Sequence, residues 1–130
     1  MNVALWIVQL LLAFAFLGAG GFKLVTPIEE LLANGMAFVE HVPALLVRFI
    51  GLSEVAGALG LVLPAATRIQ PKLTPIAASL LVVVMVLAAL THVVMNDLAG
   101  IAPSIVLGAL SAFVAWGRFT KAPIEPRSAG

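Results

Sequence analysis

Four long apolar stretches, separated by short polar segments, make up most of the chain. They lie at about residues 3–22, 43–63, 75–95 and 102–117. A helix needs roughly 20 apolar residues, at about 1.5 Å each, to cross the hydrocarbon core of a bilayer. None of the four stretches shows the two-residue alternation of a barrel strand, and only helices and closed barrels satisfy every backbone group in lipid. The pattern therefore predicts an all-α fold, an integral membrane four-helix bundle.

Prolines and a threonine indicate where these helices begin and end. Pro43 suits the first position of the second span, and Pro64 is expected to end that span. For the third span, Thr74 is expected as the N-cap with Pro75 at the first helical position. The fourth span is expected to be the shortest. The first has no basic residue before its apolar run, so we expect an uncleaved helix rather than a secretory signal.

A shorter amphipathic segment, residues 27–42, separates the first two spans. Thr26 and Glu29 have the spacing of a capping box, and Asn34 with Gly35 supplies a C-terminal stop. This pattern predicts a short helix lying in the membrane interface. The alternative is two pieces, the second of which runs from Gly35 into the second span.

The charged residues outside the spans are distributed unevenly. Both termini and the loop after the second span share one side of a four-span protein, and the basic residues on that side are Arg68, Lys72, Arg118, Lys121 and Arg127. The opposite side carries Lys23 and the acidic residues Glu29, Glu30, Glu40 and Asp97. The positive-inside rule then places both termini in the cytoplasm. We expect one domain, residues 1–122, followed by a polar, disordered tail at residues 123–130.

Composition agrees with a membrane protein and narrows the chemistry. Apolar residues make up 62% of the 130 residues and charged residues 10%, with a mean hydropathy of +1.17. A soluble domain usually has about 45–50% apolar residues and about 25% charged residues. The net charge of +1 gives no reason to expect nucleic acid as a partner. The chain has no cysteine, which excludes disulfides, thiol redox chemistry and cysteine-ligated metals. Any redox role would therefore need a bound cofactor or a partner protein.

Small residues indicate where the helices approach one another, since helices in lipid associate through close contact. The candidates on the second span are Gly51, Gly57, Ala58 and Gly60. On the first span they are Ala15, Gly18 and Ala19, and on the fourth they are Ser104, Gly108 and Ala112.

Glu54 is the most informative polar residue. It lies about 16 Å along the second span from Pro43, close to the middle of the bilayer. A carboxylate at that depth must be protonated, paired or in contact with water, and such acids commonly have a function. Because Gly51 and Gly57 share its helix face, Glu54 is expected to point into the bundle. The alternative is a structural role, in which the protonated acid hydrogen-bonds a neighbouring helix.

Three cationic or titratable residues from three spans form a layer between Glu54 and the side opposite the termini. Arg48 precedes Glu54 by six residues, a rotation of roughly 240°, so the two cannot pair within their helix. His92 and Lys23 lie at a similar level. Arg48 could instead extend to lipid headgroups, and His92 could be a satisfied structural residue. Together, Lys23, Arg48, Glu54 and His92 form a candidate site for a polar headgroup with an apolar tail, such as a quinone or lipid.

No motif assigns an enzymatic reaction. The two histidines lack the HExxH spacing, no glycine-rich loop follows a strand, and no nucleophile–base pair is apparent. Glu40 and His41 are expected to be solvated in the loop before Pro43. We therefore name no catalytic residue and no metal site.

The order of several segments resembles the DoxX-like family of small bacterial membrane proteins over roughly residues 3–122. The matching segments are FLGAGGFKL, VRFIGLSEVAGALGLVLP, a proline-started third span that closes on LTHVV, and AFVAWGRF. The resemblance implies a four-helix bundle in the bacterial cytoplasmic membrane, with Lys23, Arg48, Glu54 and His92 as family-like polar positions. The family takes its name from a subunit associated with a thiosulfate:quinone oxidoreductase, which implies quinone as a cofactor and membrane redox complexes as partners. The lack of cysteine argues against a thiol-oxidising branch.

Three functions remain open at this stage. The first is binding of a quinone or lipid in a polar pocket opposite the terminal side, within a redox assembly. The second is a non-catalytic subunit or assembly factor, either with redox partners or as a homo-oligomer. The third is transport of a small solute or proton through Glu54. Four spans are few for a transporter unless the protein oligomerises.

Overall fold

Four long helices dominate the computed structural model, which describes residues 1–40 and 42–127. They are α1 (Asn2–Val25), α3 (Ala44–Thr67), α4 (Leu73–Val94) and α5 (Leu98–Trp116). All four are long and apolar enough to cross a membrane. The fourth span runs from Leu98 to Lys121, because the π-helical turn η2 (Gly117–Lys121) continues α5. The predicted all-α, four-helix membrane fold is confirmed, and the protein is a multi-pass membrane protein.

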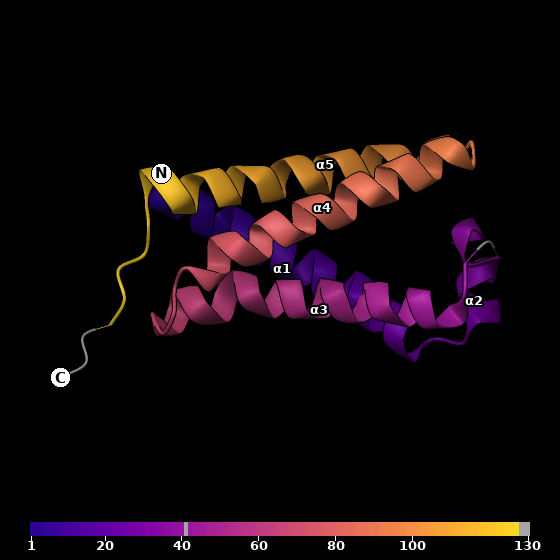
Figure 1. Cartoon of the computed structure of the whole chain (residues 1–130), viewed down its shortest axis with the longest axis horizontal. Coiled ribbons are helices and arrows are strands. Elements are labelled where there is room, and N and C mark those ends of the chain that lie inside the picture. Colours follow the sequence, from indigo (N-terminus) through magenta and orange to yellow (C-terminus); the bar gives the residue numbers. More distant parts are fainter. Residues whose placement is uncertain (41, 128–130) are drawn as a thin grey trace.

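The helices form two pairs, α1 with α3 and α4 with α5 (Figure 1). α4 lies close to α3 at the end of the bundle that carries the N-terminus, and it diverges from α3 toward the opposite end, where α2 lies (Figure 1). We call these the terminal end and the α2 end.

The main core lies where all four helices meet. Its buried side chains include Leu12, Phe16, Leu61, Leu81 and Val114, each at most 1% exposed. Large apolar side chains also cover the outer faces of the helices, as a protein surrounded by lipid requires.

Two glycines allow α1 and α3 to touch. A Cβ atom on Gly20 would lie 2.6 Å from the carbonyl oxygen of Gly51, and one on Gly51 would lie 2.7 Å from the carbonyl oxygen of Gly20. No larger residue fits without a backbone shift, so the predicted packing role of Gly51 is confirmed. Gly18 is exposed, and a Cβ there would have nothing within 4 Å. Its expected packing role is wrong, because Gly20 lies on the contact face instead.

The expected small-residue stripe on α5 is only partly correct. Ser104 is buried, and a Cβ on Gly108 would approach Met85 at 3.2 Å, but Ala112 is exposed and Ser111 is buried in its place. The buried residues Ser104 and Ser111 are seven positions apart, the spacing found in helices that cross at a small angle, whereas Ser104 and Ala112 are eight apart. On α3, Gly57 faces the Leu81 side chain of α4, as a packing role requires.

The second span does not end at Pro64, and Thr74 does not cap the third. α3 continues to Thr67, while α4 begins one residue before Thr74. Proline lacks the N–H that would bond the carbonyl of Gly60. The Thr74 hydroxyl donates to that carbonyl at 3.0 Å. The helix continues through Pro64 because Thr74 of the neighbouring helix satisfies the freed backbone group.

The fourth span is not short. α5 begins at Leu98, includes Pro103, and continues into η2, giving 24 residues in all. The start lies four residues before the predicted one because the helix accommodates Pro103, which removes only one backbone hydrogen bond.

The segment between the first two spans consists of two short pieces, α2 (Ile28–Ala33) and η1 (Ala37–Glu40), beside the end of the bundle (Figure 1). The expected stop is confirmed, since Asn34 is the C-cap of α2 and Gly35 has a φ of +96°. The capping box is wrong, because Pro27 is the N-cap and no side chain caps the helix. The expectation for His41 lies outside the described residues. Of the tail, residues 123–127 are described, and they have no regular secondary structure.

Candidate functional site

A cavity of about 440 Å³ lies between the two helix pairs in the half of the bundle nearer α2. Its walls are mainly apolar and come from α1, α3, α4 and α5. Three of the four predicted site residues, Lys23, Glu54 and His92, line it. The structure therefore brings together most of the layer that the sequence predicted.

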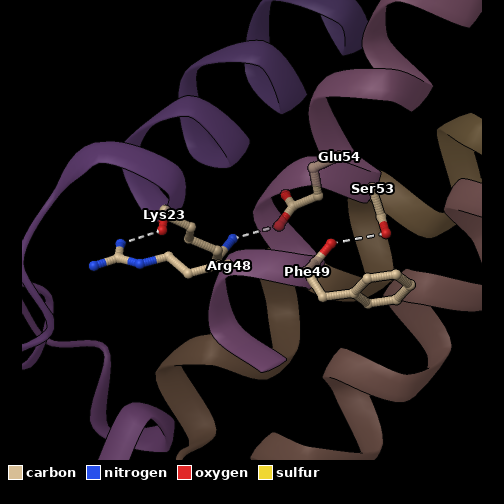
Figure 2. Close-up of polar contacts among 5 residues, drawn as sticks. All are labelled: Lys23, Arg48, Phe49, Ser53 and Glu54. Carbon is tan, nitrogen blue, oxygen red and sulfur yellow. Dashed lines mark hydrogen bonds and ion pairs between the residues drawn. The ribbon is translucent and has the colours of Figure 1, made fainter. Parts of the chain in front are cut away.

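Lys23 and Glu54 form an ion pair across the α1–α3 crossing. The Lys23 Nζ atom donates to Glu54 Oε1 at 2.6 Å (Figure 2). The Glu54 side chain is 2% exposed and that of Lys23 is 13% exposed. In this antiparallel crossing, Glu54 lies against Gly20 and Lys23 lies against Gly51. The close approach of the two glycines therefore sets the distance that the ion pair spans.

Arg48 lies outside the cavity lining. Its Nη1 atom donates to the carbonyl oxygen of Lys23 at 2.5 Å (Figure 2) and to that of Thr26 at 2.6 Å. The Lys23 carbonyl has no intrahelical donor, because the residue four positions later is Pro27. Arg48 thus caps the last turn of α1 and holds the backbone of Lys23. As expected, it does not pair with Glu54, and its role as a ligand residue stays a prediction.

His92 lines the opposite wall of the cavity. Its Nδ1 atom lies 3.1 Å from Asp97 Oδ2, and its ring packs against Gly100 of α5. Asp97, the residue before α5, was expected only as a loop acid. Because it engages Nδ1, it leaves Nε2 of His92 as the ring nitrogen free to meet a ligand.

The cavity's hydroxyl groups bond their own helices. Ser53 donates to the carbonyl oxygen of Phe49 at 2.9 Å (Figure 2). Thr91 donates to the carbonyl oxygen of Leu87, and Ser104 to that of Gly100. The hydroxyl hydrogens of these three residues are therefore engaged, which leaves Lys23, Glu54 and His92 as the lining side chains that can donate to or charge-pair with a ligand. Everything else in the cavity offers mainly apolar contact.

A second polar group, which the sequence pattern did not predict, lies at the terminal end. Arg118 is 3% exposed, and its Nε atom donates to Gln9 Oε1 at 2.7 Å while Nη1 donates to Asn2 Oδ1 at 2.7 Å. Gln9 is fully buried and donates in turn to the carbonyl oxygen of Leu61 at 2.6 Å. Gln9 interrupts the first apolar stretch, which was the available signal for this group. From the sequence alone, Arg118 is only one of the basic residues expected on the side of the termini.

No curated protein and no solved structure matches the chain significantly. The profile of the DoxX-like family matches residues 7–114, which cover most of each of the four long helices and include the four predicted site residues. Since this match spans most of the 130 residues, the chain belongs to the DoxX-like family.

Proposed function

We propose that the protein binds a quinone or a lipid molecule in the cavity between the helix pairs, with the polar end at Lys23, Glu54 and His92. The observation that supports this most directly is a hydrophobic cavity of about 440 Å³ with a buried ion pair in its wall. Cavities of roughly 300–1,000 Å³ with few polar groups are typical of small-molecule sites. An apolar chain would lie against side chains such as Ile50, Met85 and Leu107.

The polar groups suit a ligand that carries carbonyl or hydroxyl oxygens. An ammonium group has three N–H donors, and one of those on Lys23 goes to Glu54. A ligand oxygen could accept from the other donors or from the His92 ring on the far wall. Glu54 would hold the Lys23 charge in place at a depth where an unpaired ammonium is costly.

We place this binding in a membrane redox assembly, with the protein as a subunit that holds the quinone or lipid. The chain has no cysteine, so electrons exchanged with a quinone would come from a bound cofactor or a partner protein. Crosslinking in native membranes should recover a second membrane protein. Recovery of the protein alone, or of its own multimers, would contradict this part of the proposal.

We further propose that the protein resides in a bacterial cytoplasmic membrane with both termini inside. The support is the excess of basic residues at the terminal end. Because the chain lacks cysteine, single cysteines introduced at Thr120 and at Glu30 can be labelled with an impermeant reagent in intact cells. Labelling at Glu30 and protection at Thr120 are expected, and the reverse pattern would refute this orientation.

The test of binding is mass spectrometry of molecules that co-purify with the protein in mild detergent. Glu54→Gln should retain the fold, since an amide can still hydrogen-bond, but it should lose most of the bound molecule. Glu30→Gln, an exposed acid on α2, is the matched control.

A cavity-filling variant tests the location independently. Ala88 lines the cavity, whereas Ala112 on α5 is exposed on the outer surface. Ala88→Leu should lower ligand occupancy and Ala112→Leu should leave it unchanged. Equal occupancy in Glu54→Gln, Ala88→Leu and the native protein would refute the proposed site.

A further inference from the structure

A second hollow, of about 460 Å³, lies at the terminal end, away from the cavity described above. It is formed by the loop between α3 and α4 and by the tail that follows η2. Three basic residues line it, Arg68 and Lys72 from the loop and Arg127 from the tail. The remaining lining residues are uncharged, so the lining carries three positive charges and no carboxylate.

Hydrogen bonds fix the tail against the loop. The Arg68 side chain donates to the carbonyl oxygens of Glu125 at 2.8 Å and Pro126 at 3.4 Å. The Arg127 backbone N–H donates to the carbonyl oxygen of Arg68 at 2.9 Å. These contacts bring Arg127 next to residues far from it in sequence. The guanidinium of Arg127 itself makes no hydrogen bond within the described residues.

This convergence of like charges exceeds what membrane orientation requires. The positive-inside rule asks only for basic residues on one side, and it operates equally well when they are dispersed. Holding three cations around one hollow is unfavourable unless an anion shares it. The loop also holds Arg68 at φ 59° and Gln70 at φ 49°, backbone conformations that are uncommon for residues other than glycine.

The surroundings of the hollow fit the surface of a bilayer. Ile69 also lines it and is 56% exposed, and Leu73, at the start of α4, is 48% exposed. The basic groups therefore lie next to apolar side chains at the end of two membrane-spanning helices. Basic pockets in this position suit the phosphate headgroups of anionic lipids.

We propose that this hollow binds the phosphate of an anionic lipid headgroup from the leaflet on the terminal side. Lys72 and Arg127 contact the phosphate, Ile69 contacts the glycerol and upper acyl chain, and Arg68 positions the tail. This site is independent of the cavity near α2, so either could fail without the other.

The experiment measures retention of phosphatidylglycerol by the full chain, using native mass spectrometry from nanodiscs that contain equal phosphatidylglycerol and phosphatidylcholine. We expect selective retention of phosphatidylglycerol, and a loss of about fivefold for Lys72→Gln and for Arg127→Gln, from roughly 1 kcal/mol per basic residue at a membrane surface. Lys121→Gln is the matched control, because Lys121 lies on the same side, near the Trp116 ring, and does not line the hollow.

Each outcome decides the proposal. An equal loss in Lys121→Gln would show diffuse attraction to the membrane surface and would overturn the specific site. Equal retention of the two lipids would overturn it as well. If inorganic phosphate at millimolar concentration binds and displaces the lipid, the hollow takes a soluble phosphate instead. Because Glu54→Gln leaves this hollow intact, that variant should retain phosphatidylglycerol whether or not it loses the ligand near α2.

Discussion

The glycine crossing of α1 and α3 can be tested by adding a single methyl group. In Gly20→Ala, the new Cβ would lie 2.6 Å from the Gly51 carbonyl oxygen and 2.9 Å from both Glu54 Cβ and the backbone nitrogen of Val55. Two of these three atoms are backbone and cannot rotate away. The helices must therefore separate by about 0.8 Å to reach 3.4 Å, where ordinary contact begins. Overpacking of this kind typically costs about 1–3 kcal/mol.

The same helix provides two controls. A Cβ on Gly18 or on Gly21 would have nothing within 4 Å. Replacing glycine with alanine in a helix interior is otherwise favourable by up to about 1 kcal/mol. Gly18→Ala and Gly21→Ala should accordingly be neutral or stabilising, while Gly20→Ala should be destabilising. The change in the free energy of unfolding should therefore have opposite signs for these substitutions within one helix.

The assay is reversible unfolding in mixed lipid–detergent micelles by titration with sodium dodecyl sulfate, followed by near-ultraviolet circular dichroism of Trp6 and Trp116. We expect Gly20→Ala to be less stable than Gly18→Ala by about 2 kcal/mol or more. Equal free energies of unfolding for the three variants would show that α1 and α3 do not approach at Gly20. The account of how Lys23 and Glu54 are aligned would then fail too.

Three further predictions concern buried polar contacts. Lys23→Met should destabilise the protein by about 3–5 kcal/mol because it leaves Glu54 unpaired. Adding Glu54→Leu should restore most of that loss. If the destabilisation of the double variant instead equals the sum of the two single effects, the pairing is contradicted. Thr74→Val should lower the free energy of unfolding by about 1 kcal/mol. The loss should be smaller in a Pro64→Ala background, where the residue-64 N–H can again bond the Gly60 carbonyl. An identical loss in both backgrounds would show that Thr74 does not replace that bond. Gln9→Leu should cost about 1–3 kcal/mol, since it removes one partner of a buried guanidinium, and an unchanged free energy of unfolding would show that water replaces it.

The sequence by itself determined the fold class and the approximate location of the candidate site. Bilayer thickness fixes the length of apolar helix that is required, so four stretches of that length predict four spans whatever their packing. Depth along a helix follows from residue number, which is why Lys23, Arg48 and His92 could be placed in one layer with Glu54 deeper in the bilayer. Gly51 was identified as a contact residue because it is small, and Glu54 was expected to point into the bundle because it shares that face.

Tertiary structure decided the contacts between helices, because these depend on rotation and crossing angle, which a single span does not encode. It showed that Lys23 is the partner of Glu54, that Arg48 caps α1 beside them, and that Asp97 engages His92. The same reason explains the errors. Whether Pro64 ends a helix depends on a donor from a neighbouring helix, here Thr74, that can satisfy the carbonyl freed by the proline.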